Sequence, residues 1–411
     1  MPQSFVRMST TIKHIDNKKS LVPKLRFKGF NDGWRNEKLE NLIESIGSGW
    51  SPQCEEYPSN LEEWGVLKTT SVVWEGFNEK ENKKLPGNLE PRIEILVKPN
   101  DILITRAGPT NRVGVTVHVD SVRPKLMLSD KIIRLRTKEN NSSKFVAISL
   151  ANPKAQKQLV SKSSGLATSQ TNISQDILLN IKLFSPLYPE QQKIASFLSA
   201  VDEKIQQLTR KKELLEQYKK GVMQQLFSGK LRFKDENGKT FPKWEEKRLG
   251  DVLDYIQPTK YLVESTEYDD SYETPVLTAG KTFILGYTNE TKNIFKDSLP
   301  VILFDDFTTA TQFVDFPFKA KSSAMKILVA KKGENINYLY EAMQLIKFEI
   351  GGHGRHWISQ FALFKIPYPC AKEQNKIAFY LSNIDTKIES VTQQITQTQT
   401  FKKGLLQQMF V

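Results

Sequence analysis

Two long stretches of the chain carry an apolar residue at every seventh position. In the first stretch these positions are Ile194, Val201, Leu208, Leu215 and Val222, with Leu198, Ile205 and Leu226 on the neighbouring row. In the second they are Ile377, Ile384, Val391 and Leu405, with Leu381, Ile388, Ile395 and Met409 beside them. A seven-residue period predicts long helices whose apolar seam faces another helix. Ordinary core packing gives a similar pattern, so periodicity alone leaves both arrangements open.

The two helical stretches are copies of one sequence. EQQKIASFLSAVDEKI from Glu190 and EQNKIAFYLSNIDTKI from Glu373 match at ten of sixteen positions. YKKGVMQQLF from Tyr218 matches FKKGLLQQMF from Phe401 at the same offset of 183 residues. Each helix is therefore the natural partner of the other. Because the first leaves one globular stretch and the second starts from the next, the pair is expected to be antiparallel.

Helix ends can be read from glycine and proline. The first helix is expected from Pro189 to Ser228, because proline suits a first helical turn and Gly229 suits a stop. At about 1.5 Å per residue such a helix spans roughly 60 Å. Gly221 and Gly404 occupy equivalent places, and a helical glycine costs about 1 kcal/mol relative to alanine. Their repetition predicts a close backbone approach or a bend, with a frayed last turn as the alternative.

Each helix is preceded by a globular stretch that begins alike. KLRFK occurs at Lys24 and Lys230, followed by WRNEKLENLI from Trp34 and WEEKRLGDVL from Trp244, which we predict to be helical. Strands are predicted in GVLKTTSVVWEGF, DILITRAGPTNRVGVTVHVD and DKIIRLRT, then in PVLTAG, KTFILGYT, LPVILFDDFTTATQFVDF and SAMKILVA. AISLANPKAQKQLV and NYLYEAMQLIKFEI are each predicted to form one helix.

The predicted fold class is α+β, with two mixed α/β domains joined by two long helices that form an antiparallel coiled coil, and with an internal pseudo-twofold duplication. The expected organisation is a flexible N-terminal tail over 1–20, a first globular domain over 21–185, and a central spacer helix over 186–229. A second globular domain over 230–369 and a C-terminal spacer helix over 370–411 complete it. The strand order does not follow from the sequence.

Composition narrows the class of partner. The 411 residues carry a formal net charge of +13, which favours nucleic acid first and an anionic membrane surface second. Two cysteines, Cys54 and Cys370, with no neighbouring metal-ligand pattern, indicate a reducing compartment. The N-terminus has no apolar signal region and the apolar runs are far shorter than a membrane span. A cytoplasmic location is therefore expected.

Three polar loop clusters in each globular stretch are candidates for contacts with nucleic acid. Arginine and lysine suit guanine edges and phosphates, and asparagine and glutamine suit adenine edges. Solvated loops are rich in the same residue types, so each residue is a candidate only. In the first stretch the candidates are Lys68, Thr69, Thr70, Arg106, Thr110, Asn111, Arg112, Thr168, Gln170 and Asn172. In the second they are Lys281, Thr308, Thr309, His353, Arg355 and His356.

Catalytic motifs are missing from the sequence. It contains no methyltransferase NPPY-like or Pro-Cys motif, no phosphate-binding G-x-x-x-x-G-K-[ST] loop, no G-x-S-x-G elbow and no H-E-x-x-H. Asp305 and Asp306 form an acidic pair without a third ligand, which favours a loop acceptor or strand-end charge over a metal site. We therefore expect a chain without catalytic or metal residues of its own.

The doubled motifs resemble a known family. The KLRF-then-Trp starts, the two E-Q-x-x-I-A-x-x-L helices and the DILIT strand followed by Gly108 resemble the specificity subunit of type I restriction–modification systems. The resemblance covers the chain from about residue 21 to its end. LPVILFDDFTTATQF occupies the place of a second DILIT phrase, so the second domain departs from the pattern there.

The resemblance implies a division of labour. One target-recognition domain would read each half of a split double-stranded DNA target. Two modification subunits holding S-adenosylmethionine would dock on the helices and methylate adenine, and restriction subunits using ATP and Mg²⁺ would translocate and cleave. No cofactor is expected in this chain. A structural coiled-coil adaptor and a free-standing nuclease or methylase remain the rival hypotheses.

Overall fold

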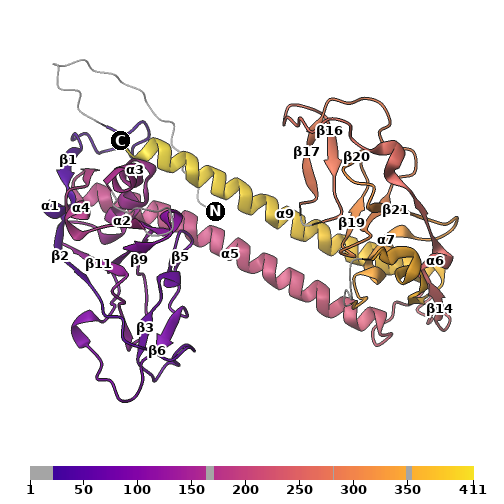
Figure 1. Ribbon diagram of the computed structural model, residues 1–411, viewed down its shortest axis with the longest axis horizontal. Coiled ribbons are helices and arrows are strands. Elements are labelled where there is room, and N and C mark those ends of the chain that lie inside the picture. Colours follow the sequence, from indigo (N-terminus) through magenta and orange to yellow (C-terminus); the bar gives the residue numbers. More distant parts are fainter. Residues whose placement is uncertain (1–21, 163–170, 281, 349–353) are drawn as a thin grey trace. The chain divides into compact units, whose positions relative to one another are not determined.

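The computed structural model describes residues 22–162, 171–280, 282–348 and 354–411. The chain divides into two compact units. Unit 1 comprises Met1–Gln206 and Thr396–Val411, and unit 2 comprises Gln207–Ile395. Two long helices, α5 (Tyr188–Phe227) and α9 (Ala371–Met409), each contribute one end to each unit (Figure 1).

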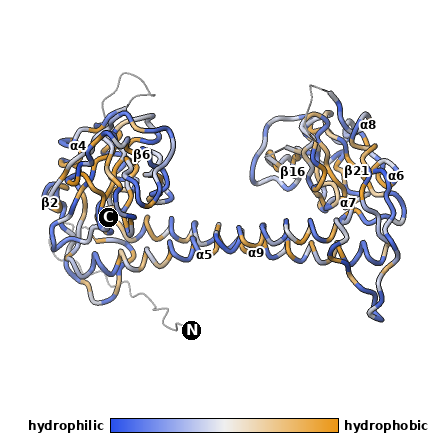
Figure 2. Tube along the Cα trace, turned by 90° about the horizontal axis from the view of Figure 1, so that it is seen from below, coloured by the Kyte–Doolittle hydropathy of each residue, from blue (hydrophilic) through white to orange (hydrophobic). Residues whose placement is uncertain are grey.

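Within each unit the ends of α5 and α9 pack together along the predicted seam. In unit 1, Ile194 and Leu198 of α5 share a buried cluster with Leu405 and Met409 of α9. In unit 2, Val222 and Leu226 of α5 share one with Ile377, Leu381 and Ile384 of α9, and hydrophobic residues recur along both helices (Figure 2). The same clusters contain side chains of the neighbouring globular domain, such as Phe145 and Tyr338. Helix pairing and core packing therefore both occur.

Ion pairs at equivalent positions hold these helix ends together. In unit 1, Lys402 Nζ lies 2.6 Å from Asp202 Oδ1. In unit 2 the equivalent pair, Lys219 and Asp385, lies 2.8 Å apart, and Lys219 also binds Glu341 at 2.8 Å. Burial raises the pKa of the Glu341 carboxyl. Burial alone would lower the pKa of Lys219, but its hydrogen bonds to Asp385 and Glu341 raise it.

The helix ends match the predictions, but the two helical glycines do not. The α5 helix ends one residue from the predicted position, and Gly229 beyond it has a left-handed φ of +70°. Gly221 and Gly404 lie inside unbroken helices, and a Cβ at either position would have no neighbour within 4 Å. The prediction of a close backbone approach is wrong, and so is the alternative of a frayed end, while the bend stays a prediction.

The two KLRFK segments anchor the start of each long helix. Arg26 donates from Nε and Nη2 to the carboxylate of Glu190, both at 2.7 Å. Arg232 binds Glu373 in the same way, at 3.1 and 2.7 Å. Both carboxylates are almost fully buried. Removal of either the arginine or the glutamate would leave the other charge unpaired in this position and would destabilise the fold.

Unit 1 is built on three main sheets. A four-stranded antiparallel sheet has the order β2 (Ile43–Ser48), β11 (Ile132–Thr137), β7 (Ile102–Thr105) and β9 (Thr116–His118). A mixed sheet has the order β10 (Leu126–Met127), β3 (Gly65–Leu67) and β6 (Asn82–Lys84). Strands β1 (Arg35–Lys38) and β13 (Lys182–Ser185) pair beside α5. The helices of the domain are α1 (Leu39–Leu42), α2 (Ser143–Ala151), α3 (Pro153–Lys162) and α4 (Gln175–Leu179).

Unit 2 repeats this topology. Its four-stranded sheet has the order β15 (Leu253–Ile256), β21 (Met325–Ala330), β18 (Val301–Asp305) and β19 (Thr311–Val314). Its mixed sheet is β17 (Ile284–Thr288), β16 (Thr274–Leu277) and β20 (Lys319–Ala320), and β14 (Glu245–Arg248) pairs with β22 (Lys365–Tyr368). The helices are α6 (Leu249–Val252), α7 (Ile336–Met343) and α8 (His356–Ser359). The predicted duplication therefore extends to the sheets, whereas the finer domain boundaries stay predictions.

One of the two inner strands of each four-stranded sheet is buried on both faces. In β7, Ile102 and Ile104 enter one core cluster and Leu103 enters another. In β18, Ile302 and Phe304 face one cluster and Leu303 faces the other. Alternate residues of a strand point to opposite faces, so an unbroken apolar run fits a strand between two cores. LPVILF thus takes the place of the DILIT phrase, as the sequence indicated.

Three predictions about helices were wrong, and one of them is NYLYEAMQLIKFEI, in which α7 already ends at Met343. The Trp-led segments begin as strands β1 and β14, and only the single turns α1 and α6 are helical. Their backbones pair with β13 and β22, which follow more than 100 residues later, so long-range pairing overrides local propensity. The predicted helix AISLANPKAQKQLV is two helices, because Pro153 disfavours a helical Asn152, whose ψ is 142°.

Candidate nucleic-acid interface

The structure brings the three loop clusters of unit 1 together. Strand β8 (Ala107–Gly108) pairs with β12 (Thr171–Asn172), and Ile173 N donates to Arg106 O at 2.9 Å. Thr110 Oγ1 and Thr171 Oγ1 lie 2.8 Å apart. Gly108 in β8 has a φ of +150°, which glycine adopts readily because it has no Cβ. The second and third clusters therefore form one surface.

The first cluster joins this surface through Arg112. Arg112 Nη2 donates to Thr69 O at 3.4 Å. Thr70 Oγ1 and Lys68 Nζ both bind Glu81, at 2.5 and 3.2 Å, and these hydrogen bonds lower the pKa of that carboxyl. Lys68 and Thr70 are thus held in place by an acid that partly neutralises the lysine.

Two asparagines are the most accessible candidates in the part of unit 1 that the structure describes. Asn111 and Asn172 are both exposed. Arg106 is half-buried, and its Nε is buried without a hydrogen-bond partner among the described residues. Its backbone N donates to Lys131 O at 2.8 Å, which places exposed Lys131 beside it. Sequence reasoning missed Lys131, because only the pairing of β7 with β11 brings it to this edge.

Unit 2 carries a tight turn after β18. Asp305 Oδ1 accepts hydrogen bonds from Phe307 N at 2.9 Å and Thr308 N at 2.8 Å. Thr309 N donates to Asp305 O at 2.9 Å, and Thr309 adopts a left-handed φ of +58°. Asp305 is therefore a loop acceptor, which was one of the two roles favoured from the sequence. Thr308 is exposed and Thr309 half-buried.

Asp306 joins this turn to the third cluster of unit 2. Its Oδ1 accepts from Trp357 N at 2.9 Å, its backbone O accepts from His356 N at 3.0 Å, and Lys326 Nζ lies 3.5 Å from its Oδ2. His356 is buried, with no partner for Nε2 among the described residues, while Arg355 is exposed. Among the described residues of this cluster, Arg355 is thus the accessible candidate. The candidates Thr168, Gln170, Lys281 and His353 lie outside the described residues.

The turns of the two units occupy equivalent positions. Arg106 N donates to Lys131 O, and Asp306 N donates to Ala324 O. The oxygens of the same two residues, Arg106 and Asp306, accept from Ile173 N and His356 N. By this pattern Arg106 corresponds to Asp306, and Asn172 to Arg355. The same backbone framework therefore carries side chains of different charge at equivalent positions in the two units.

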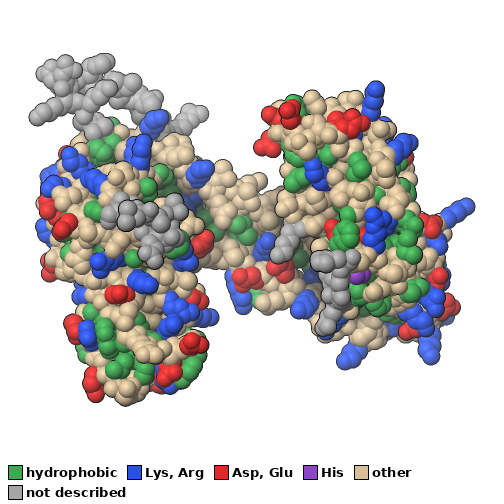
Figure 3. All heavy atoms as spheres, viewed as in Figure 1, with side chains coloured by type: hydrophobic (Ala, Val, Ile, Leu, Met, Phe, Trp, Pro, Cys, Tyr) green, Lys and Arg blue, Asp and Glu red, His purple; other side chains and the backbone are tan. Residues whose placement is uncertain are grey.

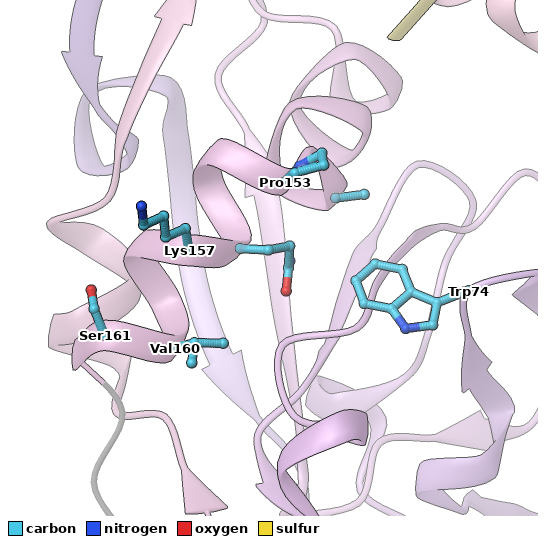
Figure 4. Close-up of a pocket in the computed structure, with 7 residues that line it drawn as sticks. Trp74, Pro153, Lys157, Val160 and Ser161 are labelled. Carbon is cyan, nitrogen blue, oxygen red and sulfur yellow. The ribbon is translucent and has the colours of Figure 1, made fainter. Parts of the chain in front are cut away.

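A groove of about 660 Å³ lies beside the loops of unit 1. Trp74, from the hairpin of β4 (Val72–Val73) and β5 (Gly76–Phe77), faces α3 across it, with Lys157 and Val160 on the helix (Figure 4). Gln156 of α3 donates to Gly114 O at 2.9 Å, which ties the helix to the end of the second cluster. Trp74 is 52% exposed. The sequence signal that could have revealed this surface is the predicted helix AISLANPKAQKQLV, which contains Lys157 and Val160.

Helix α3 is basic. PKAQKQLVSK contains no acid, and Lys154, Lys157 and Lys162 are exposed. None of the three forms an ion pair within the part of the chain that the structure describes. Elsewhere on the visible face of each unit, basic and acidic side chains are interleaved (Figure 3). The candidate interface is therefore identified by the positions of its residues and not by a uniformly basic surface.

The described residues contain no group of three His, Cys, Asp or Glu side chains placed to hold a metal ion. No described helix has the length and apolarity needed to cross a bilayer. Cys54 and Cys370 are both free, and burial raises the pKa of the Cys54 thiol.

Comparison with known proteins identifies the family of this duplicated framework. The family model described as "Type I restriction modification DNA specificity domain" matches residues 31–217 and 242–399. The chain belongs to this family. The two matches cover both sets of sheets and most of both long helices, as the resemblance in the repeated motifs implied.

Individual relatives agree with this assignment. The specificity subunit of the Escherichia coli type I restriction enzyme EcoR124I/EcoR124II is 46% identical over 163 residues, covering 38% of this chain and 40% of that protein. The EcoEI specificity subunit of the same organism is 42% identical over 166 residues, covering 40% and 28%. The chain thus spans less than half of these relatives. A crystal structure of the type I S subunit from M. genitalium has the same fold, with a TM-score of 0.66 at 16% identity, covering 95% and 99% of the two chains.

Proposed function

We propose that this chain is the DNA-specificity subunit of a type I restriction–modification complex and reads a bipartite target. The supporting observation is that two units share one backbone framework and carry different side chains in equivalent turns, Arg106–Arg112 and Asp306–Ala310. A shared scaffold with divergent loops is suited to two different half-sites. The chain itself contributes recognition and no catalytic step.

The long helices would set the gap between the half-sites. Helix α5 is continuous over 40 residues, which corresponds to about 60 Å of helix. Two modules that read one face of B-DNA need centres about one helical turn apart, roughly 34 Å. The bases between the two half-sites then matter only through their number, which sets the distance between the half-sites. Insertion of four or more residues into the first helix is expected to lengthen the tolerated gap or abolish function.

Two modification subunits are the proposed partners of the helices. They would hold S-adenosylmethionine and extract an adenine from the DNA stack, which costs a few kcal/mol. Contacts made by this chain at the correct target would offset that cost. Tyr218, Phe379 and Phe401 on the helices are 51%, 71% and 51% exposed, and such apolar side chains suit a protein partner. Restriction subunits using ATP and Mg²⁺ would join the same complex in the cytoplasm.

A domain exchange tests the proposal. Residues 30–180 are replaced by the corresponding domain of another family member, and the methylated sites of the reconstituted complex are mapped. One half of the target should change while the other half and the gap stay the same. If both halves stay unchanged, the proposed role is wrong.

Salt dependence separates this proposal from its rivals. If several phosphates are contacted, log affinity of the complex for duplex DNA falls linearly with log salt concentration. A purely structural adaptor would contact no phosphates. Under that hypothesis, replacing Lys154, Lys157 and Lys162 by alanine would leave the slope of log affinity against log salt concentration unchanged. Nuclease or methylase activity of the purified chain alone would support the other rival.

A further inference from the structure

Phe307 is an exposed aromatic residue at the tip of the turn that follows β18. The residue is 43% exposed, and Thr308 beside it is exposed as well. Exposure of an apolar ring to water is unfavourable in free energy. The exposed Phe307 side chain therefore either binds a partner or lowers the stability of the free protein.

The turn holds Phe307 in a fixed position. Asp305 Oδ1 accepts from the backbone N atoms of Phe307 and Thr308. On the preceding side, Asp306 is locked by Trp357 N and by Lys326, with both charged side chains of that pair 2% exposed. The backbone of the turn is therefore ordered before any ligand arrives, which lowers the entropic cost of binding.

The aromatic residue is specific to unit 2. In the framework alignment given by Arg106 and Asp306, the residue equivalent to Phe307 is Ala107, which pairs with Asn172 in the β8–β12 ladder. Arg355, the equivalent of Asn172, is exposed next to the turn and has the charge needed for a nearby phosphate. Unit 2 thus presents an apolar ring beside a cation where unit 1 presents amides and arginines.

We propose that Phe307 contacts the C5-methyl group of a thymine in the half-site read by unit 2. This inference rests on the proposed DNA-specificity function. Phenylalanine has no polar atom, and the thymine methyl is the apolar feature that base edges offer in the major groove. The contact distinguishes thymine from cytosine without a hydrogen bond.

The test uses the full chain assembled with its modification subunits. The half-site of unit 2 is the half that persists when residues 30–180 are exchanged. Each thymine in that half is replaced in turn by deoxyuridine, which removes one methyl group, and the dissociation constant is measured at fixed salt. One replacement should weaken binding about fourfold, the value expected for burial of one methyl group.

The variant Phe307→Ala completes a double-mutant cycle. It should weaken binding to thymine-containing DNA and lose the difference between thymine and deoxyuridine at that position, while Phe307→Leu keeps a smaller difference. Deoxyuridine in the other half-site should affect wild type and variant equally. Thermal midpoints of the variants verify that unit 2 is folded.

Three results would overturn the inference. They are indifference of the wild type to every deoxyuridine in this half, an equal loss by Phe307→Ala on both DNAs, and a loss of assembly with the modification subunits without DNA. The second would indicate a wedge between base pairs. A wild-type complex that does not distinguish its target from scrambled DNA would instead refute the proposed function.

Discussion

The turn after β7 in unit 1 and the turn after β18 in unit 2 share a backbone and differ in chemistry. Arg106 and Asp306 make equivalent backbone hydrogen bonds to neighbouring strands and segments. Arg106 is half-buried, and its Nε has no hydrogen-bond partner among the described residues, whereas Asp306 is buried against Lys326. Backbone hydrogen bonds do not depend on side-chain identity, so the framework persists while the loops diverge. Under the proposed function, these equivalent positions serve binding in unit 1 and stability in unit 2.

The largest expected difference comes from alanine at these two positions. Asp306→Ala leaves the buried Lys326 ammonium without its partner and should destabilise unit 2 by about 3–5 kcal/mol. Arg106→Ala should leave the stability of unit 1 nearly unchanged and weaken DNA binding by about 1–3 kcal/mol. Hydrogen exchange reports the stability of each unit separately, and titration of the assembled complex with target DNA reports affinity.

The double variant Asp306→Asn/Lys326→Met is the control for the first change, because it removes both charges, keeps an oxygen acceptor for Trp357 N and should recover most of the stability. Equal effects of Arg106→Ala and Asp306→Ala on stability would contradict the comparison.

A second, smaller contrast lies in the equivalent lysines of the long helices. Lys219→Met leaves the buried Glu341 without a cation and should cost unit 2 about 3 kcal/mol. Lys402→Met removes a half-exposed pair with Asp202 and should cost unit 1 less than about 1 kcal/mol. Local stabilities from hydrogen exchange measure both.

Glu341→Ile should restore stability in the Lys219→Met background. Helices α2 and α7 share a capped start, in which Ser142 and Asn335 accept from Phe145 N and Tyr338 N, and this places Ile148 at the position of Glu341. Ile148 packs against the apolar cluster of unit 1. If Glu341→Ile gave no recovery, the buried carboxylate would not be the source of the loss.

The smallest effect is expected at Gly221 and Gly404, which occupy equivalent positions in the two long helices. Gly221→Ala and Gly404→Ala should each stabilise the helix by up to about 1 kcal/mol, since the added Cβ meets no atom within 4 Å. Urea unfolding and assembly with the modification subunits would be measured together. Destabilisation by either substitution would show that the backbone is more closely packed there than the structure indicates.

The long helices and the duplication could be predicted from the sequence because their signals are local and repeated. The strands in DILIT and LPVILF were predictable for the same reason. The conversion of the Trp-led segments into β1 and β14 was not, since it depends on pairing with distant strands. The break at Pro153 had a local signal that the apolar pattern on either side concealed.

The sequence predicted which loops belong to the candidate site but not how these loops are arranged. The sequence indicated the clusters around Lys68, Arg106 and Asn172 but did not show that they form one surface. It also could not align Arg106 with Asp306, because the spacing between the strand and the following cluster differs between the units. Lys131, Trp74 and the lysines of α3 reach the surface only through strand pairing and helix packing.

The most direct test of two unlike recognition units on one framework is the methylome of cells carrying this chain and its modification subunit. The account predicts a target of two different specified halves separated by a gap of fixed length and no sequence preference. Two identical halves, one continuous specified sequence or a gap of variable length would contradict it.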